Sequence, residues 1–218
     1  MKRLLRSVWI AVLGIVLAVC GYYVFTVWQA RKITPALFES FKTDSQLRLK
    51  LADFPDGWLG DLLMVEDPNF YGHNGVDLST PGAGITTITQ GMVKYLYFEN
   101  FKPGVAKLRQ SLIAVFAVNA LIPKDEQLSV FVNTVWLGTH DGKPVRGFAE
   151  AAEEYFNKPF NNVTHDEYLS LVAMVIAPAH FHVERHPQRN AERVRRIEGL
   201  LAGEYKPSGL MDLYYDQQ

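Results

Sequence analysis

One uncharged run near the N-terminus limits what this chain can fold into. From Ser7 to Gln29 no side chain carries a charge, and most positions hold Val, Leu, Ile, Ala or an aromatic residue. A helix of roughly 20 such residues crosses a hydrocarbon core of about 30 Å. We therefore expect one transmembrane helix, and the length of 218 residues leaves room for one globular domain behind it.

Basic residues flank this run on both sides. They are Lys2, Arg3 and Arg6 before it and Arg31 and Lys32 after it. Together with the α-amino group they favour a cytoplasmic N-terminus, with the domain on the periplasmic or extracellular face of the cytoplasmic membrane. A cleaved signal peptide would need a shorter apolar core and a small-x-small site, which is not apparent. A lipoprotein signal at Cys20 fits poorly, because Val19 is bulky and the apolar run continues beyond the cysteine.

The overall charge narrows the choice of partners. A formal net charge of -1 gives no reason to expect a nucleic-acid partner. An anionic ligand would therefore be held by a local cluster of Lys and Arg. The single cysteine excludes an internal disulfide framework.

Apolar residues at helical spacing predict a mainly α domain. The expected helices cover residues 58–66, 88–96, 107–121, 124–137, 147–157, 164–178 and 187–203. Thr34-Pro35 is typical of a helix start, and Thr164 with Glu167 forms a capping box. No segment alternates with a period of two, so we expect no strand.

The residues from Leu62 onward read LLMVEDPNFYGHNGVD. The ordered positions within this stretch are Glu66, Asp67, Phe70, His73 and Gly75. They resemble the first signature of the peptidoglycan glycosyltransferase family, which is the transglycosylase domain of monofunctional transglycosylases and of bifunctional penicillin-binding proteins.

Further signatures of this family follow in the same order. The second is similar to GITTITQGMVKYLY from Gly84, the fourth to KDEQLSVFVNTVWLG from Lys124, and the fifth to GFAEAAEEYFNKPF from Gly147. The resemblance implies a lysozyme-like transglycosylase domain behind one transmembrane helix. The expected parts are a cytoplasmic tip and anchor (1–32), a helical connector (33–54), a transglycosylase-like domain (55–204) and a C-terminal tail (205–218).

The chain departs from the family at three polar positions. Ser111 replaces the glutamate of the third signature, which is the family's second important carboxylate. Ser129 replaces the glutamate of the fourth signature, and Gly91 replaces the second glutamine of the second signature. The stretch between Asp77 and Gly84 is also shorter than is usual in the family. We expect an activity that is weakened or specialised.

Members of the family join lipid-linked disaccharide-peptide units (lipid II) into a glycan chain. A sugar hydroxyl attacks the anomeric carbon of a donor, and a lipid pyrophosphate leaves with inversion. The resemblance implies that Glu66 is the catalytic base. Glu66 also follows an apolar run, where desolvation would raise its pKa toward the range that suits a base. The substrate-binding residues expected beside it are Thr86, Gln90, Lys94, Lys107 and Arg109.

Other residues are expected to support this site or to take no part in it. Asp67, Phe70, His73 and Asn133 are predicted to fix loops and helix ends, with His73 bracing the Glu66 loop. His180, His182 and His186 fit no zinc spacing, so no metal site is predicted. The family leaves a divalent cation open and implies no other cofactor. The aromatic run Tyr95, Tyr97, Phe98 and Phe101 fits either ordinary core or the surface of the bilayer.

Two other functions stay open. The substitutions at Gly91, Ser111 and Ser129 favour a catalytically silent relative, which would bind lipid-linked precursor or other cell-wall synthesis proteins as a membrane scaffold. A lysozyme-like hydrolase of finished glycan fits less well, because the basic residues suit a phosphate leaving group.

Overall fold

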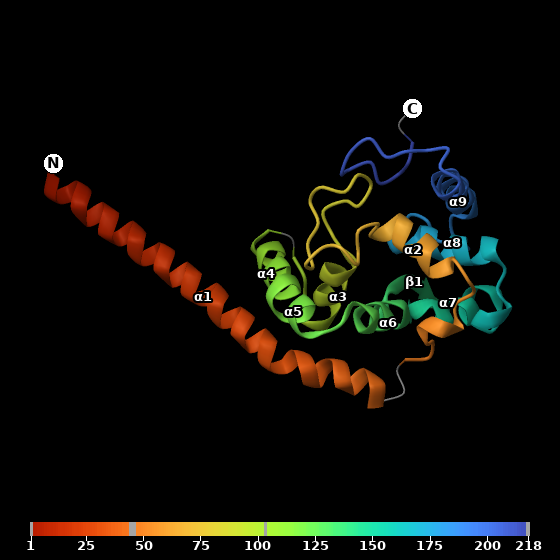
Figure 1. Ribbon diagram of the computed structural model, residues 1–218, viewed down its shortest axis with the longest axis horizontal. Coiled ribbons are helices and arrows are strands. Elements are labelled where there is room, and N and C mark those ends of the chain that lie inside the picture. The colour runs from red at the N-terminus through yellow and green to blue at the C-terminus, as the bar shows by residue number, and fades with distance from the viewer. Residues whose placement is uncertain (1, 44–46, 103, 217–218) are drawn as a thin grey trace.

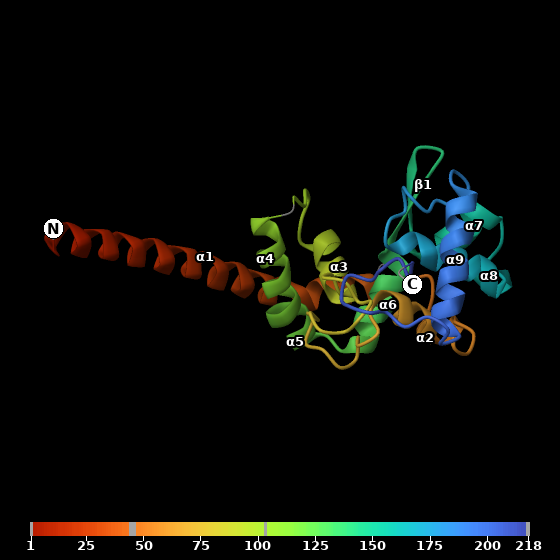
Figure 2. The ribbon, with the colours of Figure 1, turned by 90° about the horizontal axis from the view of Figure 1, so that it is seen from above.

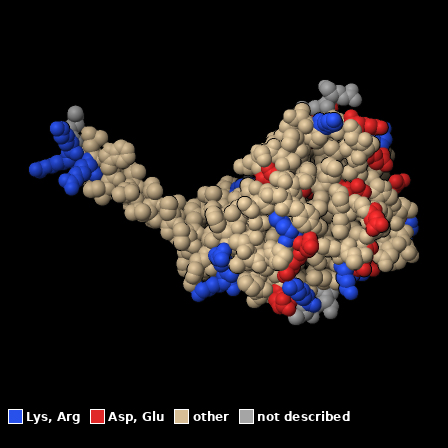
Figure 3. All heavy atoms as spheres, viewed as in Figure 1, with Lys and Arg blue, Asp and Glu red and all other residues tan. Residues whose placement is uncertain are grey.

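The computed structural model describes residues 2–43, 47–102 and 104–216, and it is mainly α-helical as predicted. Helix α1 (Lys2–Thr43) begins far from the rest of the molecule and reaches it only with its C-terminal part (Figure 1). One stretch of α1, Leu5–Lys42, is long and apolar enough to cross a membrane. Figure 3 shows basic side chains at the N-terminal tip and an uncharged surface along the segment that follows.

The predicted helix start at Thr34-Pro35 is wrong, because α1 continues through both residues. Within the helix, the Thr34 hydroxyl donates to the carbonyl oxygen of Ala30 at 2.6 Å. Proline lacks an N–H and bends a helix rather than ending it when packing holds both sides, and α1 does bend in its C-terminal part (Figure 1). Phe38 beyond the bend is only 1% exposed, so tertiary packing outweighs the local stop signal.

The remaining helices form two groups. Figures 1 and 2 show α4 (Val105–Ile113) and α5 (Asn119–Leu121) beside α1, and α3 (Ile88–Leu96) packs against α4. A π-helical segment, η2 (Ala114–Val118), joins α4 to α5, so the expected helix 107–121 is present with one irregular turn. The other group contains α2 (Trp58–Glu66), α6 (Lys124–Thr134), α7 (Gly147–Phe156), α8 (His165–Val175) and α9 (Pro187–Leu201). Two short 3-10 turns, Leu51–Asp53 and Phe160–Asn162, complete the described helical elements.

A buried aromatic cluster fixes the start of α2. Trp58 stacks on Tyr168 of α8 with ring centroids 4.4 Å apart, and the Tyr168 hydroxyl donates to the carbonyl oxygen of Trp58 at 2.8 Å. Phe54 and Phe160 pack against the same Tyr168 ring. Because the N-terminal turn of α2 is held in this way, the position of its last residue, Glu66, is also fixed.

The structure contains a short β-hairpin that the sequence analysis did not expect. Strand β1 (Trp136–His140) pairs in antiparallel fashion with β2 (Lys143–Arg146), so helix α6 ends earlier than predicted. Asp141 and Gly142 join the strands with φ angles of 47° and 78°. Two adjacent positive φ angles are typical of a two-residue type I′ hairpin, for which Asp-Gly is a strong local signal. The strands were missed because they are short and their register is irregular between Trp136 and Thr139.

Candidate active site

Glu66, the last residue of α2, lies in the wall of a pocket of about 550 Å³. The pocket is bounded by α2, the loop before α3, α3 itself, α6, the segment after α8, α9 and the C-terminal segment. The Glu66 Oε1 atom is buried and has no hydrogen-bond partner among the described residues. Glu66 also forms no ion pair within the described part of the chain. No hydrogen bond to Oε1 and no ion pair among the described residues would therefore have to be broken for the Glu66 carboxylate to act on a ligand.

The surroundings of Glu66 place its proton equilibrium near neutrality. Burial raises the pKa of Glu66 from 4.5 to about 7, against an opposing effect of the Arg193 charge and with a further increase from Asp67. A carboxyl group with a pKa near the working pH can accept a proton and release it again. The site thus has the chemistry of a general base.

Two lysines form a cationic part of the same region. Lys94 of α3 lines the pocket, and Lys107 of α4 donates from Nζ to the hydroxyl of Thr86, another lining residue, at 2.7 Å. Burial and the neighbouring charge of Lys94 lower the pKa of Lys107. Neither lysine has a carboxylate at ion-pair distance among the described residues. Two adjacent cations without a counter-ion are suited to binding an anion such as a phosphate group.

Arg193 of α9 is a pocket residue that the sequence analysis missed. It is only 2% exposed, and its Nη1 donates to the carbonyl oxygen of Leu213 at 2.9 Å. The guanidinium packs over the rings of Tyr214 and Tyr215 at 5.8 and 5.3 Å from their centroids. Arg193 and Glu66 line the same pocket, so the structure adds a buried positive charge close to the candidate base.

The C-terminal segment, residues 205–216, builds one wall of the pocket. Gly82 and Gly84 donate backbone hydrogen bonds to Gly209 at 2.9 Å and to Leu210 at 2.8 Å. The Tyr215 hydroxyl donates to the carbonyl oxygen of Val65, next to Glu66, at 3.0 Å. Leu213, between these anchor points, lines the pocket itself. The short loop before α3 is thus covered by the end of the chain.

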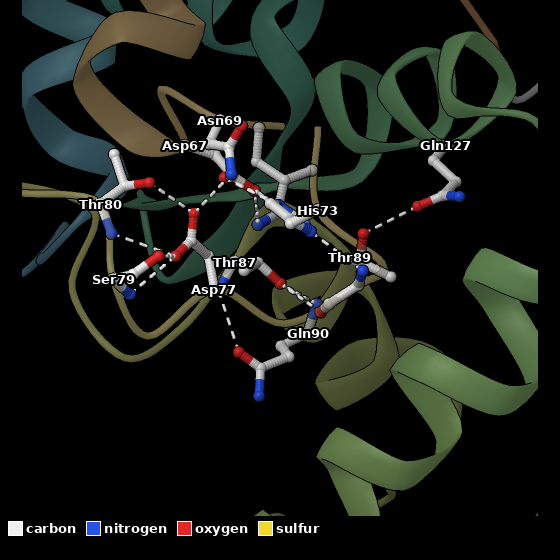
Figure 4. A network of polar contacts seen from close by, with 12 residues as sticks. Asp67, Asn69, His73, Asp77, Ser79, Thr80, Thr87, Thr89, Gln90 and Gln127 are labelled. Carbon is white, nitrogen blue, oxygen red and sulfur yellow. Dashed lines mark hydrogen bonds and ion pairs between the residues drawn. The ribbon is translucent and has the colours of Figure 1, made fainter. Parts of the chain in front are cut away.

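A polar network holds the loop that follows Glu66 (Figure 4). His73 donates from Nε2 to Asp67 at 2.9 Å, and its Nδ1 accepts from the backbone N–H of Gly75 at 2.9 Å. Asp67 also accepts from the backbone N–H of Ile88, the first residue of α3, at 3.0 Å. Both ring nitrogens of His73 are therefore engaged with the protein, and the network ties the end of α2 to the start of α3.

The same loop packs closely on the π-helical segment η2. Gly75 has a φ of +93°, and a Cβ placed there would lie 2.7 Å from the carbonyl oxygen of Ala114. Only glycine fits this position without strain. Phe70, 1% exposed, packs under the Lys124 ammonium group at 4.5 Å. Phe70 and Gly75 thus hold in place the loop after Glu66, called here the first-signature loop, without reaching the pocket.

Of the predicted site residues, Glu66, Thr86 and Lys94 line this pocket, whereas Lys107 contacts its wall only through Thr86 and the other predicted residues lie elsewhere. Gln90 is 1% exposed, and its side chain is used within the protein: Oε1 accepts from the backbone N–H of Thr87 at 3.0 Å, and Nε2 donates to Ser111 at 2.8 Å. Asn133 binds the backbone of Leu49 through both amide atoms, at 2.9 and 2.8 Å, and so fixes the segment that leads from α1 to α2. Arg109 lies in a different pocket beside α1.

The structure locates two of the positions at which the sequence analysis expects departures from the family. Ser111 faces α3, where it accepts the hydrogen bond from Gln90 and donates to the carbonyl oxygen of Lys107 at 3.0 Å. Gly91 lines the pocket, and a Cβ there would meet no atom within 4 Å. The pocket is therefore open beside Gly91.

In the described ranges no cluster of three or more His, Cys, Asp or Glu side chains could hold a metal ion. Of the three histidines near the end of the domain, His182 bonds the backbone oxygen of Thr139 at 3.1 Å, and His180 lines the pocket on its own.

Known proteins resemble this chain over the same region. A family model described as Transglycosylase matches residues 34–201, which is most of the chain. Penicillin-binding protein 1B of Vibrio cholerae is 28% identical over 78% of this chain and 23% of its own length. Penicillin-binding protein 1B of Escherichia coli is 29% identical over 72% of this chain and 20% of its own length. Penicillin-binding protein 1A of Neisseria cinerea is 30% identical over 68% of this chain and 20% of its own length.

The matched region is less than a quarter of the length of each of these three relatives. The family match covers the loop that follows Glu66, Lys94, Lys107 and the whole of α9. With its mainly helical fold and its open, carboxylate-bearing pocket, this chain belongs to the transglycosylase family.

Proposed function

We propose that this protein is a peptidoglycan glycosyltransferase. It polymerises lipid-linked disaccharide-peptide at the outer face of the cytoplasmic membrane, to which α1 anchors it with the N-terminus inside. The single observation that carries the proposal is the placement of Glu66, whose unpaired carboxylate lines an open pocket together with Lys94. Membership of the transglycosylase family supports the same reaction class.

In the proposed reaction Glu66 acts on the acceptor. Its carboxylate removes the proton from a sugar hydroxyl while the hydroxyl oxygen forms a bond to the anomeric carbon of the donor. The bond from that carbon to the pyrophosphate oxygen breaks on the opposite face, which inverts the configuration. A pKa of about 7 for Glu66 keeps about half of the carboxyl groups ready to accept the proton at neutral pH.

Lys94 and Lys107 act on the leaving group. Their charges lie on α3 and α4 without a carboxylate partner among the described residues. Charge that develops on the departing pyrophosphate is stabilised by cations that are already in place. Thr86, which holds the Lys107 ammonium group, positions this second cation.

The proposed activity is weakened or specialised. Ser111 stands where the family has its second carboxylate, and its hydroxyl is taken up by Gln90 and by the helix backbone. Loss of one preorganised electrostatic contact costs about 100-fold or more in rate. A pyrophosphate is nevertheless a good leaving group, and cations can assist it without a general acid.

The test uses the full chain in detergent with purified lipid-linked disaccharide-peptide. Two quantities are measured on the same preparation: the glycan polymer formed, and the amount of precursor bound. The proposal predicts both binding and a polymer that lengthens with time. Binding without any polymer contradicts it.

That second outcome would instead support a catalytically silent scaffold that presents lipid-linked precursor or cell-wall synthesis partners. The observation that favours this alternative is the pair of small residues at Ser111 and Gly91, where the family carries longer polar side chains.

A further inference from the structure

A second pocket, of about 490 Å³, lies between α1 and the side of the domain formed by α3 and α4. Its α1 wall contains Thr26, Gln29 and Ile33, and its opposite wall contains Phe98, Glu99 and Arg109. Arg109 and Glu99 are the only charged side chains among its described lining residues. The pocket thus presents one positive and one negative group in an otherwise uncharged cavity.

Two clamps hold the walls of this pocket together. The hydroxyl groups of Thr34 on α1 and Tyr97 after α3 lie 2.7 Å apart. Arg31 of α1 also donates from Nη1 to the carbonyl oxygen of Phe116 in η2. The C-terminal part of α1 is therefore packed against the α3–α4 side of the domain, and the pocket lies within this packed region.

Arg109 has no ion-pair partner among the described residues. Its guanidinium stacks on Phe98, with the central carbon 4.9 Å from the ring centroid. Nε is buried without a hydrogen-bond partner, and no carboxylate lies at ion-pair distance in the part of the chain that the structure describes. A buried guanidinium N–H without an acceptor is unfavourable, and a planar stacked arginine is well suited to a phosphate oxygen.

The position of the pocket along α1 gives its depth. Thr26, Gln29 and Ile33 lie where the uncharged run of α1 ends, and Arg31 and Lys32 are the first charged residues after it. In an anchored chain this level is that of the lipid headgroups.

The surface next to Arg109 is apolar and exposed. Val105 and Leu108 of α4 are 73% and 50% exposed, and Phe116 of η2 is 51% exposed. Side chains of this kind beside a headgroup pocket can contact acyl chains.

We propose that this pocket binds the headgroup of a membrane phospholipid of the phosphoethanolamine type, with its phosphate on Arg109 and its ammonium group on Glu99. The inference rests on the membrane anchoring of the proposed function and does not depend on sugar transfer. The proposal assigns Arg109 to the second pocket and not to the pocket that contains Glu66, which Arg109 does not line. Tyr95 lines both pockets and lies between them.

Native mass spectrometry of the full chain in detergent tests this site. The protein is supplied in turn with phosphatidylethanolamine, phosphatidylcholine, phosphatidylglycerol and a polyprenyl diphosphate, and the lipid retained on it is measured. Wild type is expected to retain phosphatidylethanolamine best. Arg109→Gln lowers this retention about ten-fold, as expected for the loss of a charge-assisted hydrogen bond.

Three further variants sharpen the test. Glu99→Gln removes the preference for phosphatidylethanolamine over phosphatidylcholine, because both lipids keep the phosphate. Arg109→Lys retains part of the binding, which shows that the loss in Arg109→Gln is not a folding defect. Lys102→Gln removes the same charge from the loop before α4, outside the pocket lining, and leaves retention unchanged.

Equal retention of the three phospholipids by wild type, or wild-type retention by Arg109→Gln, overturns the proposal. It is also overturned if Arg109→Gln loses only the polyprenyl diphosphate, because Arg109 would then serve the lipid-linked substrate. Glycan polymerisation measured on the same preparations is a separate readout, so failure of the lipid site and failure of the transferase can be told apart.

Discussion

The chemistry of the pocket depends on a balance between burial and charge at Glu66. Burial disfavours the carboxylate, whereas the buried guanidinium of Arg193 favours it. The Glu66 carboxylate forms no ion pair among the described residues, so no direct partner cancels the effect of burial or of Arg193 on its pKa. The result is a carboxyl group with a pKa of about 7, which can exchange protons near neutrality.

Glu66→Gln is expected to stabilise the protein above pH 7. Between its usual pKa of 4.5 and the folded pKa of about 7, the folded protein holds a proton that the unfolded chain has released. A rise in pH through this window therefore favours unfolding, and the penalty is fully present above pH 7. Urea unfolding at pH 5 and pH 8 measures the effect. The expected gain appears at pH 8 and shrinks at pH 5; equal stability of the two proteins at pH 8 would contradict the raised pKa.

Arg193→Gln should move the pH profile of polymerisation. Without the guanidinium the pKa of Glu66 rises further, because the favourable charge is lost while burial remains. The acid limb of the rate profile then shifts to higher pH. Arg193→Lys keeps a charge in the same place and should retain most of the wild-type profile, which controls for a packing defect. An unchanged acid limb in the glutamine variant is the outcome that excludes this role.

The sequence identified some of these residues and missed others for a physical reason. Glu66, Lys94 and Lys107 stand in ordered signatures that local spacing reveals. Arg193 lies far along the chain on a helix with several other arginines, and only the fold turns it inward. A signal was nevertheless present. Arg193 falls on the buried stripe of α9, whose members are Asn190, Arg193, Val194, Ile197 and Leu200.

At the scale of elements, helix α3 connects the loop that follows Glu66, the proposed base, to Lys94. Its N-terminus is held by Asp67 and by a capping box, and its last turn carries Lys94. Thr87 accepts from the backbone N–H of Gln90 at 3.2 Å and donates to the carbonyl oxygen of Gly75 at 2.8 Å. The cap of α3 is therefore also a tie to the first-signature loop.

Thr87→Ala should lower both stability and activity. Loss of an N-cap costs about 1 kcal/mol, and here the tie to Gly75 is lost as well. Thr164→Ala is the matched control, since Thr164 caps α8 with the same capping box but lines no part of the site. Urea unfolding should show a loss in both variants, whereas polymerisation should fall only in Thr87→Ala. Equal activity of the two variants would show that α3 is not held through its cap.

The helices were predictable because caps and apolar spacing are local. The capping box at Thr164 and the apolar stripes of α3 and α7 set helix positions close to those observed. The hairpin and the continuity of α1 were not predictable in the same way. The strands of the hairpin are too short to show alternation, and the passage of α1 through Pro35 depends on packing partners far along the chain.

At the scale of the whole molecule, α1 combines a stretch that is long and apolar enough to cross a membrane with a part of the domain core. Its N-terminal part is exposed and apolar, whereas Ala30, Phe38 and Phe41 are buried in the core. Figures 1 and 2 show that this C-terminal part runs beside the helices of the domain. The exposed apolar part of α1 and its core-packed part are therefore divided along its length.

Two truncations should separate these functions. Removal of residues 1–25 takes away exposed apolar surface and should leave the unfolding midpoint of the domain nearly unchanged. Removal of residues 1–43 also takes Phe38 and Phe41 out of the core, and loss of one buried Phe side chain costs about 3–5 kcal/mol. Urea unfolding of both proteins in detergent measures the difference. Similar midpoints would show that α1 contributes nothing to the core.

The rate of glycan polymerisation by wild type and by Glu66→Gln tests the central claim most directly. The assay uses the full chain in detergent at pH 8 with purified lipid-linked disaccharide-peptide. Glu154→Gln, which changes an exposed carboxylate of α7, is the matched control. We predict polymer from wild type and Glu154→Gln, and a rate at least about 100-fold lower for Glu66→Gln. A Glu66→Gln protein that polymerises at the wild-type rate would contradict the account.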